Sequence, residues 1–126
     1  MSAIHLTLDG GIAELRLDNP TKLNSLTLAM LADLSRHLDT LDRTPGLRAV
    51  ILTAEGERAF CTGADITAWG DLSPADFARH WVRDGHRIFD RLARLHVPTI
   101  AALQGPAFGG GLELASACDL RVMAPA

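Results

Sequence analysis

The chain has few of the features that direct a protein into a membrane or out of the cell. Its two cysteines, Cys61 and Cys118, stand in apolar surroundings without metal-ligand spacing, which favours reduced, buried thiols. Residues 1–9 lack the basic start and apolar block of a signal peptide. The longest stretch without Asp, Glu, Lys or Arg, Leu95–Leu112, contains two prolines and four glycines and is a poor membrane span. These absences predict a soluble, cytoplasmic protein.

Several binding signatures are missing as well. A net charge of −3 and a pI near 5.9 give no reason to expect nucleic acid as a partner. The glycines follow neither the dinucleotide-binding pattern nor the phosphate-loop pattern. The five histidines are scattered along the chain, and His80 and His86 are expected to point to different sides of one helix. We therefore expect no metal site.

The composition is that of one globular domain. Hydrophobic residues make up 48% and charged residues 21% of the chain. Its length of 126 residues is enough for one core and too short for two ordinary domains. We therefore treat residues 1–126 as a single domain, in which no repeat of fixed period is found.

Hydrophobic periodicity predicts alternating strands and helices. The expected elements are a hairpin of Ile4–Asp9 and Ile12–Leu17, a helix over 27–42, a strand at Ala49–Thr53 buried on both faces, a long helix capped by Ser73, a strand at Thr99–Leu103, a helix at Gly110–Cys118 and a strand at Asp119–Met123. Leucines from Leu28 to Leu41 form the stripe of the first helix, and the long helix carries Phe77, Trp81, Ile88, Leu92 and Leu95 on one side. This order predicts an α/β fold with a largely parallel sheet.

The segment Thr99–Asp119 carries the strongest functional signal. It is a buried strand, a glycine-rich loop, and a helix that opens with glycines and has Glu113 in its first turn. Glycines allow backbone N–H groups to approach a ligand, and a helix start favours negative charge. The segment therefore predicts a site that stabilises an anion beside a carboxylate able to move a proton. The alternative for Glu113 is a first-turn acid that only stabilises its own helix.

Three motifs in series resemble the crotonase superfamily, whose best-known member is enoyl-CoA hydratase. They are NPTKLNSL at 19–26, ERAFCTGADI at 57–66 and QGPAFGGGLE at 104–113. The resemblance implies a repeated ββα core and a coenzyme A thioester as substrate, with coenzyme A part of that substrate and no separate cofactor. It also implies that the N–H groups of Ala64 and Gly110 hold the thioester oxygen, and that Glu113 acts on the water that adds to C3.

The resemblance further implies contacts with the rest of the substrate. Lys22 matches a basic position near the coenzyme A phosphates, and Leu23, Ser25 and Leu26 belong to the same region. The adenine, pantetheine and thioester portions of the substrate are bordered by Gly63, Asp65, Ile66 and Gly109. Cys61 is adjacent to these residues, and Phe108 forms a wall of the acyl pocket. Each of three residues has an alternative. A lone lysine in a loop such as Lys22 is more often solvated, Asp65 is equally typical of a turn residue that bonds its own backbone, and Phe108 is also compatible with simple packing.

Family members are longer than this chain. In hydratases a second catalytic glutamate falls shortly beyond Ala126, so the core is expected to be truncated at its C-terminal side. We expect the 126 residues alone not to hydrate crotonyl-CoA at a rate typical of the family, which an assay of the purified chain tests. Apolar edges on such a piece predict a homo-oligomer, a trimer or a dimer of trimers by resemblance.

Glu113 favours hydratase chemistry among the reactions of this superfamily. Isomerases, thioester hydrolases and dehalogenases use the same scaffold, so these remain alternatives. A non-catalytic module for coenzyme A binding or oligomerisation is the alternative of another class.

Overall fold

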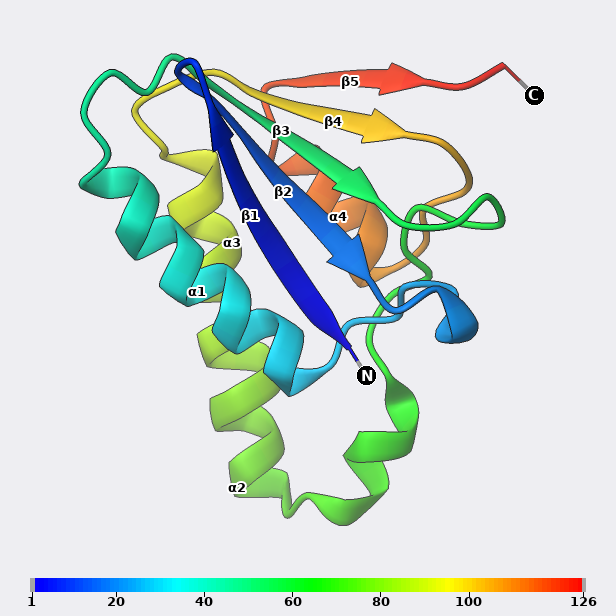
Figure 1. Cartoon of the computed structure of the whole chain (residues 1–126). Helices are drawn as coiled ribbons and strands as arrows, with labels where there is room; N and C mark the ends of the chain where they lie inside the picture. The colour runs from blue at the N-terminus through cyan, green and yellow to red at the C-terminus, as the bar shows by residue number, and fades with distance from the viewer. Residues whose placement is uncertain (1, 126) are drawn as a thin grey trace.

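The computed structural model describes residues 2–125, apart from the side chains of residues 68 and 69, so both ends of the predicted domain lie outside the described residues. The elements are β1 (Ala3–Asp9), β2 (Ile12–Asp18), η1 (Pro20–Lys22), α1 (Leu28–Asp42), β3 (Ala49–Ala54), η2 (Ile66–Asp71), α2 (Pro74–Phe77), η3 (Ala78–Arg83), α3 (Asp84–Ala93), β4 (Thr99–Leu103), α4 (Gly110–Ser116) and β5 (Leu120–Met123). The predicted α/β architecture is confirmed (Figure 1).

One sheet organises the molecule. Its strand order is β1-β2-β3-β4-β5, in which β1 and β2 are antiparallel and the remaining neighbours are parallel. The hairpin turn is made by Gly10 and Gly11, whose φ angles of 58° and 88° favour glycine. Because β2, β3 and β4 run in the same direction, their carboxyl ends meet at one edge of the sheet. The loops that follow them are brought together there.

The core lies on one face of the sheet. Leu15, Leu17, Val50, Leu52 and Ala101 are buried in a single cluster with side chains from α1, α3 and α4. The prediction that the third strand is buried on both faces is wrong, because the burial of β3 alternates between its two sides. Helices of the described chain cover one face, so the side chains of the other face stay partly accessible (Figure 1).

The predicted long helix is interrupted. Ser73 caps it as expected, because its hydroxyl accepts a hydrogen bond from Asp76 N at 3.1 Å. After α2, the six residues of η3 form a π-helix before α3 continues the chain. A π-helix rotates the following residues relative to a regular α-helix. Phe77, which precedes this segment, lies half-buried, whereas Ile88 and Leu92, which follow it, enter the core.

The other helix boundaries lie close to the predictions. Thr27 caps α1 by accepting from Met30 N at 3.1 Å, but Leu28 is exposed at the start of the predicted stripe. Helix α4 ends before the predicted Cys118, and Asp119 instead accepts a hydrogen bond from Thr99 N at 2.9 Å. None of the described helices has the length and apolar character needed to cross a bilayer.

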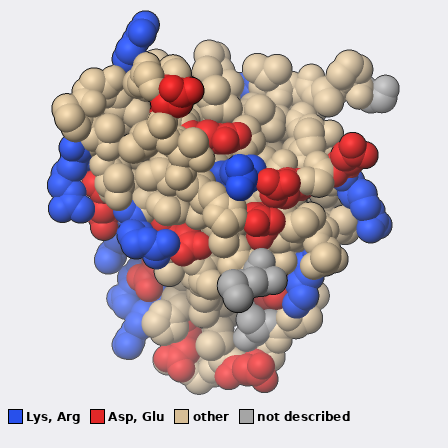
Figure 2. All heavy atoms as spheres, viewed as in Figure 1, with Lys and Arg blue, Asp and Glu red and all other residues tan. Residues whose placement is uncertain are grey.

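Charges of both signs share the surface. Figure 2 shows Asp and Glu side chains interspersed with Lys and Arg side chains on one face of the molecule. Described ion pairs include Arg91 with Asp39 at 2.7 Å, which joins α3 to α1.

Candidate active site

The loop after β3 is held against the loop before α1. Leu26 N donates to Gly63 O at 2.7 Å, and Asp65 N donates to Leu26 O at 2.8 Å. In a parallel bridge of this kind, the residue between the two bonded positions, Ala64, directs its own N–H to the opposite side. The N–H of Ala64 therefore faces away from Leu26.

The start of α4 supplies a second donor close to the first. A Cβ placed on Gly110 would lie 3.7 Å from Ala64 N, and one on Gly63 would lie 3.5 Å from Gly110 N. Gly109, with a φ of 51°, makes the turn into the helix. Within residues 2–125, no protein acceptor takes the N–H of Ala64 or of Gly110. The structure thus brings two unbonded backbone donors together at one point.

Close backbone packing fixes the spacing of these donors. Gly111 is buried, and a Cβ at this position would lie 2.2 Å from Cys61 O. Phe108 N also donates to Cys61 O at 3.0 Å. The glycine run, Gly109–Gly111, therefore packs directly on the backbone of the loop that carries Ala64. This contact explains why no side chain fits at Gly111.

Asn24 fixes the site loops from within the first motif, a role that the sequence reasoning did not assign to it. It is 1% exposed, and its side-chain amide donates to Glu55 O at 2.8 Å and Ala59 O at 3.1 Å while its oxygen accepts from Asn19 N at 2.8 Å. These bonds tie the loop after β2 to the loop after β3. The signal was its place inside the motif NPTKLNSL, but sequence alone does not indicate which backbone groups it would bond.

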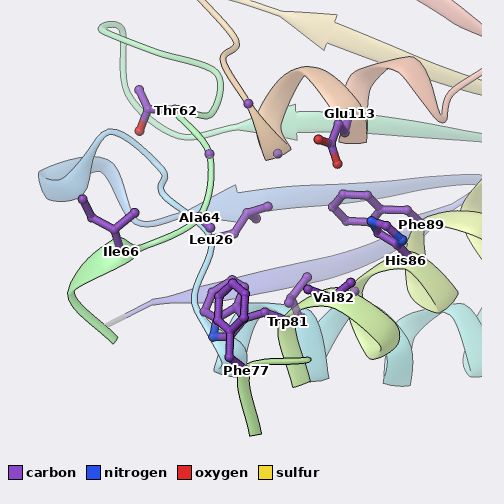
Figure 3. A pocket seen from close by; sticks show the side chains of 15 residues that line it. Leu26, Thr62, Ala64, Ile66, Phe77, Trp81, Val82, His86, Phe89 and Glu113 are labelled. Carbon is purple, nitrogen blue, oxygen red and sulfur yellow. The ribbon is translucent and has the colours of Figure 1, made fainter. Parts of the chain in front are cut away.

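A cavity of about 470 Å³ opens beside the two donors (Figure 3). Predicted residues that line it are Leu26, Gly63, Ala64, Ile66, Gly109, Gly110 and Glu113. Residues that the sequence reasoning did not assign to it are Leu31, Thr62, Phe77, Trp81, Val82, Gly85, His86 and Phe89. Apart from Leu31 and Thr62, these come from α2, η3 and α3, so the interrupted helix forms the wall opposite the glycine run. The size and mostly apolar lining are typical of a small-molecule site.

Glu113 reaches this cavity from the first turn of α4. Figure 3 shows its carboxylate pointing from the helix into the cavity. The side chain is exposed, and within the described residues it accepts no hydrogen bond and makes no ion pair. In particular it does not accept from the N–H groups that begin its own helix. The geometry therefore leaves the carboxylate available to a ligand.

Lys22 and Asp65 pair with one another at the edge of this region. Their Nζ and Oδ2 atoms are 3.6 Å apart, and the Lys22 side chain is largely exposed. Asp65 accepts from Thr67 Oγ1 at 2.6 Å and from Thr67 N at 3.1 Å. The Thr67 hydrogen bond lowers the pKa of Asp65 below its usual value, and Lys22 adds to this effect against the opposing effect of burial. Asp65 thus forms the turn considered as its alternative, and its contact with coenzyme A stays a prediction.

Besides Lys22 and Asp65, four predicted site residues lie outside the cavity lining: Leu23, Ser25, Cys61 and Phe108. Phe108 is 58% exposed, so within the described structure it does not wall the pocket. Cys61 is fully buried within the loop after β3. Leu23 and Ser25 act through their backbone, because Leu23 O accepts from Thr62 N and Ser25 O accepts from Asn19 Nδ2.

We expect both thiols to be inert in the folded chain. Burial raises the pKa of Cys61 to about 11, with an opposing hydrogen bond from the Gly63 backbone, and burial likewise raises the pKa of Cys118 to about 11. At neutral pH the thiols of the native chain should not react with Ellman's reagent, whereas both thiols should react once the chain is unfolded. Rapid stoichiometric labelling of the native chain would contradict this expectation.

Sequence comparison assigns a family to this arrangement. Residues 7–126 match the family described as enoyl-CoA hydratase/isomerase. The chain belongs to this family. Among the residues the structure describes, no group of three or more His, Cys, Asp or Glu side chains is arranged to hold a metal ion.

Relatives of this enoyl-CoA hydratase/isomerase family member share both sequence and fold. "Probable enoyl-CoA hydratase 2, mitochondrial" of Arabidopsis thaliana is 36% identical over 114 residues, which cover 90% of this chain and 38% of that protein. "Fatty acid oxidation complex subunit alpha" of Idiomarina loihiensis is 41% identical over 116 residues, which cover 91% of this chain and 16% of that protein. The crystal structure of an enoyl-CoA hydratase from Bacillus anthracis superposes with a TM-score of 0.89 at 35% identity. The match covers 95% of this chain and 46% of that one. The chain therefore spans less than half the length of these relatives.

Proposed function

We propose that this chain carries the thioester-binding half of an enoyl-CoA hydratase, which adds water reversibly to a 2-trans-enoyl-CoA. The observation that supports this most directly is the pair of unbonded N–H groups of Ala64 and Gly110, beside a cavity that Glu113 enters. Two backbone donors at one point suit a thioester oxygen that becomes negatively charged in the transition state.

In this proposal the two donors bind the thioester carbonyl oxygen. As water adds to C3, the π pair of the C2–C3 double bond shifts to lie between C1 and C2, and the π pair of the carbonyl group moves onto that oxygen, which gives an enolate. Each preorganised donor stabilises such an oxyanion by about 3 kcal/mol. Glu113 exchanges a proton with the water, and the second carboxylate that the resemblance implies beyond Ala126 serves the other proton transfer. The enolate then takes a proton at C2, so that one water is added.

The rest of the substrate would lie along the loops that border the cavity. Lys22 is a candidate for the coenzyme A phosphates because its ammonium group is exposed and flanks the site through Asp65. Leu26 and Ile66 line the cavity and would contact the pantetheine arm or the acyl group. Coenzyme A is part of the substrate, and no separate cofactor is proposed. A homo-oligomer, a trimer or a dimer of trimers, is proposed for the whole protein.

Other reactions of the same scaffold remain the principal alternatives. An isomerase, a thioester hydrolase or a dehalogenase would use the same two donors. An isomerase adds no water and would not require a carboxylate at Glu113. A non-catalytic coenzyme A-binding module would bind thioesters without turnover.

Replacement of Glu113 by Gln tests the proposal. In the full-length gene product, Glu113→Gln should lower kcat for hydration of crotonyl-CoA about 100-fold, because the amide cannot exchange a proton with water. Binding of the substrate analogue butyryl-CoA should change little, since the amide keeps the size of the carboxylate.

The outcomes separate the alternatives. A loss in kcat below tenfold would assign Glu113 to helix stabilisation instead of catalysis. Retained thioester binding with no hydration by the unsubstituted protein would favour the non-catalytic module or another reaction of the scaffold.

A further inference from the structure

One other side chain in the cavity is able to work with Glu113. Of the residues that line the cavity, Glu113 and His86 alone carry ionisable side chains within the described structure. His86 enters from α3, on the wall that faces the glycine run, and Figure 3 draws both side chains toward the same end of the cavity. Two helices far apart in sequence thus each contribute one proton-exchanging group.

The acidic side chains on the helix of His86 are already engaged. Asp84 lies 3.6 Å from the imidazole of His80, and Asp90 accepts from Arg94 Nε at 2.9 and 3.0 Å. His86 itself makes no hydrogen bond or ion pair within residues 2–125. The carboxylate of Glu113 is equally without a protein partner in that part of the chain. Among the described residues that line the cavity, the imidazole and the carboxylate are therefore the two ionisable side chains without a protein partner.

We propose that His86 is a positioning residue for Glu113: its imidazole N–H holds the carboxylate in the orientation that the reaction requires. The inference rests on the proposed function, since it assigns a role within that reaction. An imidazole carries a donor on one ring nitrogen in its neutral form and on both when protonated. A carboxylate held through one oxygen keeps the other free for water.

The two groups are not directly hydrogen-bonded in the structure, so contact between them requires a bridging water or a rotamer change. Both side chains are exposed on the cavity, which leaves their rotamers free to adjust. Hydrogen bonds of this kind commonly lengthen in ligand-free sites and tighten when substrate binds. A bridging water is nearly as favourable as a direct bond.

The test compares three variants of the full-length gene product with crotonyl-CoA as substrate. His86→Leu should lower kcat at least about tenfold with little change in KM, because it acts on the chemical step through Glu113. His86→Gln should restore kcat to within about threefold of the unsubstituted protein, since its amide still donates a hydrogen bond. His80→Leu is the matched control, because His80 lies in the same helical stretch but outside this cavity, and it should leave kcat unchanged.

A double-mutant comparison separates positioning from packing. In a Glu113→Gln background, His86→Leu should cost less than about twofold, because the group through which it acts is gone. An equal cost in both backgrounds, or a His86→Leu kcat equal to that of His80→Leu, would overturn the proposal.

A readout without substrate distinguishes this inference from the proposed function. The imidazole ¹⁵N resonances of His86, identified by their loss in His86→Leu, should shift when Glu113 becomes Gln, either in the free protein or with the analogue butyryl-CoA bound. Unchanged resonances would overturn the pairing even in an active enzyme. A shift in a protein that does not hydrate crotonyl-CoA would support the pairing and refute the hydratase proposal.

Discussion

A Gly111→Ala variant of the chain is expected to lose about 3–5 kcal/mol of its free energy of unfolding. The added Cβ would lie 2.2 Å from the carbonyl oxygen of Cys61 and 2.7 Å from its Cβ. The obstruction is backbone, which no side-chain rotation relieves. Helix α4 would have to move away from the loop after β3, and buried contacts of Leu114 and Ala115 would loosen with it. Urea unfolding followed by circular dichroism measures this loss.

Gly85→Ala is the matched control for this experiment. Gly85 is also buried and helical, but a Cβ there meets no atom within 4 Å. Alanine should therefore stabilise the chain by about 0.5–1 kcal/mol through its better helix propensity. A Gly111→Ala variant that unfolds within about 1 kcal/mol of the original chain would contradict the close packing described above.

A Gly110→Val variant of the full-length gene product is expected to lose about 1,000-fold in kcat/KM for crotonyl-CoA. The Cβ of residue 110 would point across the gap between the two donors, 3.6 Å from Leu26 Cδ1 and 3.7 Å from Ala64 N. These are ordinary contact distances, so the fold accommodates the substitution. The valine methyl groups would extend into the cavity and occupy the space that a thioester needs beside Ala64.

Stability measurements keep this prediction specific to the site. The melting temperature of Gly110→Val should stay close to that of the original protein, in contrast to Gly111→Ala. Gly85→Ala again serves as control, because it narrows the same cavity from the opposite wall without touching either donor. Equal losses of kcat/KM in Gly110→Val and Gly85→Ala would indicate a loss of volume instead of a blocked oxyanion site.

Local sequence patterns predicted most elements because each depended on nearby residues. The glycines of the hairpin, the Thr27 and Ser73 caps, and the strand Thr99–Leu103 all appear where expected. The π-helical segment was not predicted, because the apolar residues from Phe77 to Leu95 fit one continuous helical stripe. Burial of the third strand on both faces was also wrong, because a Val- and Ile-rich strand does not reveal whether both faces are covered.

The part of the site carried by the sequence motifs was predictable. The part formed by side chains of α2, η3 and α3 was not. Gly63, Ala64, Gly110 and Glu113 were identified because consecutive motif positions carry them. The opposite wall was missed. Phe77 and Trp81 follow the pattern of core residues, and only the tertiary arrangement turns them and His86 toward the glycine run.

The paired donors of Ala64 and Gly110 belong to the main chain, so no mutation deletes either N–H group short of proline. What mutation changes readily is the set of side chains around them, Glu113 above all. Descendants of such a scaffold would inherit the anion-binding point and diverge in the reaction that follows. The glycine motif therefore indicates common ancestry but does not indicate which product a given descendant makes.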